Sequence, residues 1–324
     1  MSLRFYNKLL PYTLAIGLAT AAAPTYGVVV VGDAPIEGNP QVVVGVPHSD
    51  TETSVTISRK QYVISWDYER RIPEWSAWIL NKRLLGSVAR SGDFRLDWDL
   101  DEALADEGRT SVGTNDYKGS CIDRGHQVAS ADRTATDNDN RSTFLMSNVM
   151  PQAAYMNRRT WVSLERFLRR QVLENDQHVQ IYAGPIMGRR RPGIGPDKDI
   201  LVPEWNYKIA VLMPASRDTP QRNQMRFFVA NFPNVTSTGT NPVDDQEQAC
   251  WDYNHTMVPD DSNHQAYWRG FVTGLKDVQA ESGVSFDFLD GIHEMTADEV
   301  DQLISQDHQQ TVTSKLPESV PVHH

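Results

Sequence analysis

Strand-like and helix-like segments follow one another along this chain without the regular strand–helix–strand rhythm of a parallel α/β fold. Residues 55–67 (VTISRKQYVISWD) alternate in polarity and are rich in β-branched and aromatic residues, which is typical of a hairpin. Further strand patterns lie at 178–186, 207–213 and 225–232. This interspersion predicts an α+β fold, with a mostly antiparallel central sheet flanked by helices in one domain.

Three segments carry helical patterns, and two others are predicted as loops. In residues 160–175 (TWVSLERFLRRQVLEN) apolar positions recur at three- and four-residue intervals, which predicts an amphipathic helix. Residues 73–85 (PEWSAWILNKRLL) have a proline near their start and similar spacing, so a helix is predicted there too. Residues 290–306 predict a short acidic helix, and polar residues 96–117 and 188–199 predict surface loops.

The first 23 residues have the layout of a secretory signal. Arg4 and Lys8 precede a 15-residue apolar run, Leu9 to Ala23, which ends in small residues. Such a run is short for a bilayer core of about 30 Å, so export with removal of the leader is favoured over a permanent anchor. We expect a secreted or periplasmic protein without stable membrane association. An uncleaved anchor and a mitochondrial presequence are the alternatives.

The chain then divides into three further parts. Residues 24–54 are valine-rich and broken by Gly and Pro, which predicts an extended N-terminal arm. Residues 55–295 hold the predicted strands and helices of the main domain. Residues 296–324 predict the acidic helix followed by a disordered tail.

Charge is distributed unevenly over a protein whose net charge is −11. That total argues against a protein that coats nucleic acid by bulk attraction, because phosphates are attracted to Lys and Arg. Residues 151–200 nevertheless carry a net +4, whereas residues 241–324 carry −13. The basic segment indicates phosphate contacts, and a solvated helix face with a charged loop is the alternative.

Only two cysteines are present, Cys121 and Cys250. In an oxidising compartment they could form one disulfide that closes a long loop, and the sequence is equally compatible with two free thiols. A metal site built on two isolated cysteines without a CxxC pair is not indicated.

The stretch CIDRGHQVAS (121–130) holds residues suited to phosphodiester hydrolysis. The sequence contains no GxSxG, P-loop, GxGxxG or HExxH motif. Arg124 and His126 are two positions apart, so on a strand both side chains point to one side, and Gly125 between them lets a backbone approach closely. Histidine is a suitable base near neutral pH, and the planar guanidinium of arginine can donate two parallel hydrogen bonds to a phosphate. Alone, this histidine is equally typical of a polar residue at a strand end.

The longer pattern resembles the DNA/RNA non-specific endonucleases, the ββα-metal or His-Me finger nucleases that include secreted sugar-non-specific nucleases and endonuclease G. The resemblance rests on DRGHQVAS (123–130) and on TFLMSNVMPQAAYMNRRTWVSLE (143–165), in family order and at near-family spacing. Weaker matches are FRLD (94–97), YAGPI (182–186) and VPEWNYKI (202–209). The resemblance implies that roughly residues 45 to 290 form a nuclease domain with a ββα-metal site.

The resemblance implies roles for five residues. His126 would be the general base that activates water, and Arg124 would bind the scissile phosphate. Asn157 would be the single protein ligand of Mg²⁺, an ion that keeps several waters and prefers oxygen donors; Mn²⁺ is an alternative ion. Glu165 lies eight residues on, about 12 Å along a helix, and would hold the metal through water. Asn148 matches a position that supports the site.

Other residues are assigned less directly. Arg95, in FRLD, is the candidate for a second active-site arginine, with Arg109 as the rival. Substrate backbone contacts are predicted for four further arginines, Arg158, Arg189, Arg190 and Arg191, and an exposed charged turn is the alternative for Arg189 to Arg191. For Asn157 and Glu165 the alternatives are helix capping and a surface ion pair. Asp123 is expected to be a structural partner of a nearby base.

Together these features predict an exported, Mg²⁺-dependent endonuclease that cleaves DNA and RNA to 5′-phosphate products with little sequence preference. Two other functions remain as hypotheses: a nucleic-acid-binding module without catalysis on the same fold, and a phosphodiesterase for smaller nucleotides. The sequence is compatible with both a monomer and a homodimer.

Overall fold

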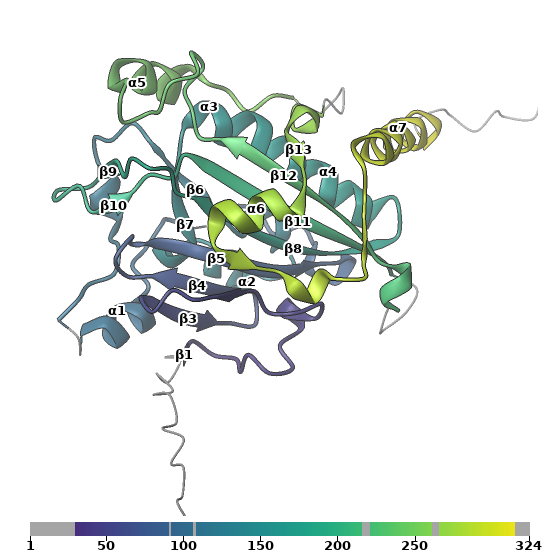
Figure 1. Cartoon of the computed structure of the whole chain (residues 1–324), viewed down its shortest axis with the longest axis horizontal. Coiled ribbons are helices and arrows are strands. Elements are labelled where there is room, and N and C mark those ends of the chain that lie inside the picture. The colour runs from purple at the N-terminus through teal and green to yellow at the C-terminus, as the bar shows by residue number, and fades with distance from the viewer. Residues whose placement is uncertain (1–29, 91, 106–107, 216–220, 261–265, 315–324) are drawn as a thin grey trace, which may run out of the picture.

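A large sheet forms the centre of the protein. The computed structural model describes residues 30–90, 92–105, 108–215, 221–260 and 266–314, and within them a nine-stranded sheet runs in the order β1-β3-β4-β5-β8-β11-β12-β13, with β15 beside β12 (Figure 1). Neighbours are antiparallel except in the pairs β1–β3 and β12–β15, which confirms the predicted α+β class. The strands are β1 (Val30–Val31), β3 (Ser54–Ser58), β4 (Val63–Asp67), β5 (Ile72–Leu80), β8 (Gln177–Ile186), β11 (Trp205–Pro214), β12 (Arg226–Pro233), β13 (Val272–Thr273) and β15 (His293–Glu294).

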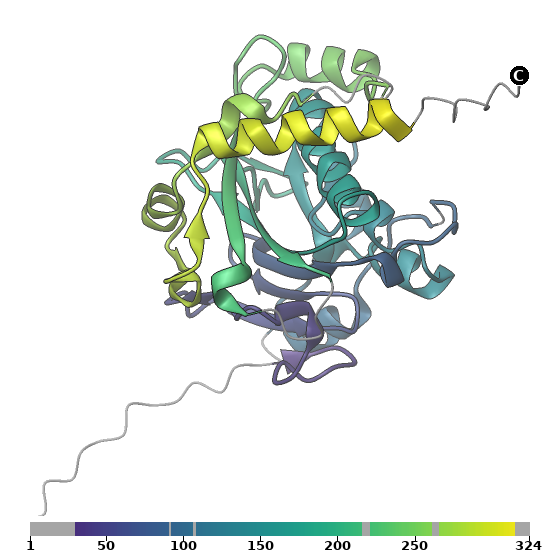
Figure 2. The ribbon, with the colours of Figure 1, turned by 90° about the vertical axis from the view of Figure 1, so that its right-hand side faces the viewer.

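Helices cover both faces of this sheet. Side chains alternate along a strand, so Ile181 of β8 joins the core beneath helix α4 (Val162–Leu173), while its neighbour Tyr182 joins a second core beneath α6 (Leu275–Ser282). Figure 2 shows the sheet standing between the two helices. The amphipathic helix predicted at 160–175 is confirmed as α4, and the hairpin predicted at 55–67 is confirmed as β3–β4.

The helix predicted at 73–85 is wrong, because this segment forms the central strand β5. Trp78 and Leu80 pack in the α4 core, whereas Trp75 and Ile79 pack in the α6 core. A strand buried on both faces has apolar residues at consecutive positions, and their spacing imitates a helical stripe. Pro73 is accommodated because the β4–β5 register shifts beside it.

Two acidic segments are more ordered than predicted. The loop predicted at 96–117 contains helix α1 (Trp98–Ala105), which buries Leu100 and Leu104. Asp99 and Asp101 lie in its first turn, where negative charge stabilises a helix. The short helix predicted within 290–306 is α7 (Ala297–Ser314), 18 residues long. Residues 307–314, which the sequence predicts as the start of a disordered end, continue this helix instead. Residues 315–324 lie outside the described residues.

The predicted N-terminal arm is packed against the main domain from residue 30 on. It contributes β1, strand β2 (His48–Ser49), which pairs with β14 (Val284–Ser285), and a 3-10 turn, Pro40–Val42. The buried Gln41 side chain accepts hydrogen bonds from the backbone N–H of Ile79 and from Arg133. The predicted signal, residues 1–23, lies outside the described part of the chain, within which no helix is long and apolar enough to cross a membrane.

Candidate active site

The stretch DRGH forms one strand of a small ββα unit beside the main sheet. Strand β6 (Asp123–His126) pairs antiparallel with β7 (Val149–Gln152), and a helical segment follows: α3 (Ala154–Met156), a π-helical turn (Asn157–Trp161) and α4. A Cβ atom at Gly125 would lie 2.6 Å or less from three atoms of the Gln152 side chain, so the close pairing requires glycine. π-helical turns inside helices are frequent at functional sites, and here one begins at Asn157.

A cleft of about 410 Å³ opens beside this unit and brings together four residues predicted for the site. Arg124 and His126 reach it from β6, and Asn157 and Glu165 from the helical segment. Arginines surround the cleft, which gives it a positive wall in an acidic protein. Its remaining lining residues are Arg90, Phe94, Asp123, Ala129, Ser130, Ala131, Arg158, Val162, Arg169, Tyr253 and Val258.

His126 is held as a neutral imidazole. Its ring lies between those of Phe94 and Phe144, with centroids 5.0 Å away in both cases. Burial, and to a lesser extent the charge of Arg90, lower the pKa of His126 to about 3. In the described part of the chain its Nε2 atom has no hydrogen-bond partner. A neutral imidazole with an uncommitted nitrogen is in the form that accepts a proton at neutral pH.

The amide of Asn157 is oriented by Asp123. The Asn157 Nδ2 atom donates to Asp123 Oδ2 at 2.9 Å. A carboxylate oxygen accepts hydrogen bonds, so the amide nitrogen of Asn157 must face Asp123. The amide oxygen Oδ1 is then available to coordinate a cation. Asp123 also forms an ion pair with Arg158, which confirms it as the structural partner of a nearby base.

This donor set fits a hard divalent cation such as Mg²⁺. An amide oxygen directed by a second residue, with a carboxylate nearby, suits an ion that keeps most of its waters. The described residues contain no group of three or more His, Cys, Asp or Glu side chains placed to hold a metal. A thiolate or polyhistidine site is therefore not built in this part of the chain, whereas a largely hydrated ion needs no such cluster.

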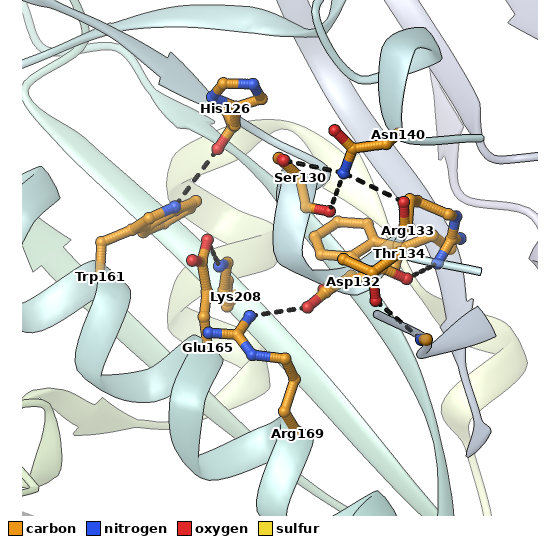
Figure 3. A network of polar contacts seen from close by, with 12 residues as sticks. His126, Ser130, Asp132, Arg133, Thr134, Asn140, Trp161, Glu165, Arg169 and Lys208 are labelled. Atoms are coloured by element: carbon orange, nitrogen blue, oxygen red, sulfur yellow. Dashed lines mark hydrogen bonds and ion pairs between the residues drawn. The ribbon is translucent and has the colours of Figure 1, made fainter. Parts of the chain in front are cut away.

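Glu165 is anchored from behind by a buried lysine. Lys208, on β11, donates from Nζ to Glu165 Oε1 at 2.9 Å, and its side chain is 0% exposed. Its ammonium lies 3.9 Å from the centre of the Trp161 ring, and the Trp161 indole N–H donates to the backbone carbonyl of His126 (Figure 3). Burial lowers the pKa of Lys208, and the Glu165 carboxylate opposes that shift. One network thus links the backbone of His126, the Glu165 carboxylate and the core of the sheet.

Arg169 follows Glu165 by one helical turn and also lines the cleft. Its Nη1 donates to Asp132 Oδ1 at 2.8 Å (Figure 3). The other oxygen of Asp132 accepts from the Trp78 indole N–H. Arg169 belongs to the basic segment 151–200, in which the sequence indicates no individual role for it. Arg169 lies four residues after Glu165, on the same helix face. This spacing could have identified it as a cleft residue from the sequence.

Neither Arg95 nor Arg109, the two candidates for a second active-site arginine, lines the cleft, whereas Arg158, Arg169 and Arg90 line it together with Arg124. Arg90 had no predicted role. Its guanidinium carbon lies 5.0 Å from the Phe144 ring centroid, and burial lowers its pKa while Glu165 raises it. Arg95 Nη1 instead donates to the Arg141 carbonyl at 2.7 Å. Arg109 lies over the Tyr68 ring, away from the cleft lining. The backbone of residue 95 forms an isolated β-bridge with Leu145.

Asn148 has a supporting position. It is fully buried; its Oδ1 accepts from the Val128 N–H, and its Nδ2 donates to the carbonyls of Val128 and Thr143. These bonds fix the chain just after His126. Asn148 is therefore placed to orient the site and not to touch a substrate.

The remaining predicted arginines are outside the cleft or already engaged. Arg190 makes a bidentate pair with Asp244 at 2.6 and 2.7 Å, and Arg189 and Arg191 are exposed in the same loop. Arg158 lines the cleft, but its guanidinium bonds to Asp123 and to two backbone carbonyls. The structure favours a structural role for Arg158 over a phosphate contact.

Cys121 and Cys250 form a disulfide, with a Cα–Cα distance of 4.8 Å across 129 residues of sequence. It joins the start of β6 to helix α5 (Gln246–His255), which contributes Tyr253 to the cleft. The sequence left this bridge open because spacing along a chain does not determine distance in the fold.

We expect Lys208→Met to lower the free energy of unfolding by about 3 kcal/mol, because it leaves the Glu165 carboxylate buried without its partner. Urea unfolding measures the change. Lys82→Met is the matched control, since Lys82 forms an exposed pair with Asp176 at 3.1 Å and should cost under about 1 kcal/mol. Equal effects of the two substitutions would contradict the anchoring role.

Comparison with known proteins gives one consistent result. The family model of the DNA/RNA non-specific endonucleases matches residues 43–292. A nuclease from Nostoc sp. is 34% identical over 200 residues, which cover 60% of this chain and 70% of that protein. Human mitochondrial endonuclease G is 31% identical over 169 residues, 49% of this chain and 54% of that protein.

A solved structure supports the fold. A chain from the crystal structure of the EndoG/EndoGI complex superimposes with a TM-score of 0.57 at 21% identity, covering 82% of this chain and 96% of that chain. The family match extends over most of the sequence and includes both halves of the ββα unit. The protein therefore belongs to the DNA/RNA non-specific endonuclease family and is an endonuclease.

Proposed function

We propose that this protein is a Mg²⁺-dependent endonuclease that hydrolyses DNA and RNA with little sequence preference and leaves 5′-phosphate ends. The observation that carries the proposal is the convergence of His126, Arg124 and Asn157 on one cleft from two different elements. A base, a phosphate ligand and an oriented oxygen donor for a cation are the groups that phosphodiester hydrolysis requires.

Each residue of the site has a different role in the proposed hydrolysis. Arg124, steadied by a hydrogen bond to the Thr114 carbonyl at 2.9 Å, binds the phosphoryl oxygens together with Arg90. His126 removes a proton from the attacking water. Asn157 holds the cation through Oδ1, and Glu165 accepts hydrogen bonds from its water shell. When bound, the cation supplies positive charge that stabilises the departing 3′ oxygen.

The character of the cleft supports broad substrate use. Its charged walls are mostly arginine, and arginine contacts to phosphate position a nucleic acid without reading its sequence. The phosphodiester link is common to DNA and RNA, so a site built around phosphate acts on both. Aromatic and apolar groups, among them Phe94 and Tyr253, complete the wall.

We also propose export from the cytoplasm. A disulfide between Cys121 and Cys250 persists in oxidising compartments, which agrees with the secretory leader expected at residues 1–23.

Purified protein lacking residues 1–23 should degrade plasmid DNA and RNA with Mg²⁺ and lose that activity with a chelator, because the cation neutralises the leaving oxygen. A Mg²⁺ titration on both substrates and on a small model diester measures this. Chelator-resistant cleavage would contradict the metal assignment. Binding without cleavage would indicate a non-catalytic module, and activity confined to the model diester would indicate a small-molecule phosphodiesterase.

A further inference from the structure

Arg158, the residue after the proposed cation ligand Asn157, donates hydrogen bonds from all three nitrogens of its guanidinium. Nε and Nη2 donate to the two carboxylate oxygens of Asp123 at 2.9 and 2.6 Å. Nη1 donates to the backbone carbonyls of Tyr253 and Thr256 at 2.8 and 3.0 Å. Four of the five N–H groups of the side chain are thus used, so Arg158 acts as a clamp between β6 and the end of α5.

The clamp acts directly on the residue that orients Asn157. The Asp123 carboxylate receives Arg158 on both oxygens and receives Asn157 Nδ2 on one of them. A carboxylate fixed by a bidentate fork has little freedom to rotate. The direction of the Asn157 amide, and with it the position of Oδ1, therefore depends on Arg158 two contacts away.

Helix α5 supplies the fixed carbonyls, and the disulfide holds α5. Within the described residues, α5 buries only Ala249 and Asp252, so apolar packing contributes little to its position. Cys250 on α5 is bonded to Cys121, two residues before Asp123. The disulfide, Asp123, Arg158 and the Tyr253 carbonyl thus form a closed ring of covalent and hydrogen bonds.

We propose that Arg158 is a positioning residue, clamped by the disulfide-anchored helix α5, which holds Asn157 Oδ1 in place for the cation. Breaking the Cys121–Cys250 bond then weakens binding of the cation. This inference rests on the proposed function, because it takes Asn157 as the cation ligand. Reduction by dithiothreitol transfers two electrons and two protons to the two sulfurs, giving two thiols, while the reagent closes to its cyclic disulfide.

Mn²⁺ serves as the probe, because binding removes its free-ion signal in electron paramagnetic resonance and needs no turnover. Arg158→Met and the double variant Cys121→Ser/Cys250→Ser should each raise the Mn²⁺ dissociation constant about 10-fold, the scale typical of residues that orient metal ligands. The Mg²⁺ concentration for half-maximal cleavage should rise in parallel, while the rate at saturating Mg²⁺ falls much less.

The controls separate positioning from folding. Arg269→Met removes another bidentate arginine–aspartate pair, that with Asp301, and should leave Mn²⁺ affinity unchanged. Dithiothreitol should weaken Mn²⁺ binding by the parent and have no further effect on the double serine variant. Arg158→Lys, which keeps the charge and loses the fork, should fall between parent and Arg158→Met.

Parental Mn²⁺ affinity in both Arg158→Met and the double serine variant would overturn the inference. If the parent protein itself binds Mn²⁺ and cleaves nucleic acid, this result leaves the proposed function in place. A parent that neither binds Mn²⁺ nor cleaves would instead overturn the proposed function and this inference together. If Arg158→Met does not fold, Arg158→Lys and the reduced parent decide the same question.

Discussion

His126→Ala lowers the rate of plasmid cleavage by about 10²- to 10⁴-fold, the contribution expected of a positioned general base. The imidazole is already deprotonated at pH 7, because burial lowers its pKa to about 3. Initial rates at saturating Mg²⁺ measure the effect. The fold should be retained, since the ring packs at the cleft between Phe94 and Phe144 and not in the centre of either core.

Two further substitutions make this result interpretable. His126→Gln keeps most of the side-chain volume without a basic nitrogen, so it should be as inactive as His126→Ala. His48→Ala removes an exposed histidine whose contact is with Asp50, and should cleave at the parental rate. Parental cleavage by His126→Ala, with the fold intact, would remove His126 from the mechanism.

Asn157→Ala should weaken divalent cation binding by at least about 100-fold, beyond the range seen when residues behind a metal ligand are changed. It removes the Oδ1 donor and leaves Asp123 with Arg158 alone. Cleavage at ordinary Mg²⁺ concentrations should fall with the affinity, and higher Mg²⁺ should restore part of it. Calorimetric titration with Mg²⁺ measures the binding separately from turnover.

Asn81→Ala is a suitable control, because it removes an amide that caps a short 3-10 turn outside the cleft. It should leave both the calorimetric affinity and the cleavage rate as in the parent. If Asn157→Ala binds Mg²⁺ as the parent does, the cation must be held by other groups and the assignment of Asn157 is wrong.

Periodicity identified the hairpin β3–β4, the strands β8, β11 and β12 and the helix α4, but misassigned the strand at the centre of the sheet. In β5, Trp75 and Trp78 fall on opposite faces of a sheet that is covered on both sides. No polar alternation remains in such a strand, so pattern alone does not distinguish it from a buried helix. In α1, acidic residues that resemble loop composition stabilise the first turn of a helix.

For the site, the family resemblance predicted the residues of β6 and of the following helix, because each of the two motifs is a short continuous stretch of sequence. The position of Arg90 at the cleft was not predictable in this way. Arg90 and Arg95 lie five residues apart in an irregular segment, and only the folded chain shows that Arg90 reaches the cleft. Lys208 was within a matched stretch, VPEWNYKI, yet its pairing with Glu165 joins positions 43 residues apart.

A crystal structure of His126→Ala with Mg²⁺ and a short duplex tests the central claim most directly. We expect one phosphodiester in the cleft, with Mg²⁺ within about 2.1 Å of Asn157 Oδ1 and the space vacated by the imidazole on the opposite side of the phosphorus atom. A duplex bound to another surface, or a cation held away from Asn157, would contradict the account.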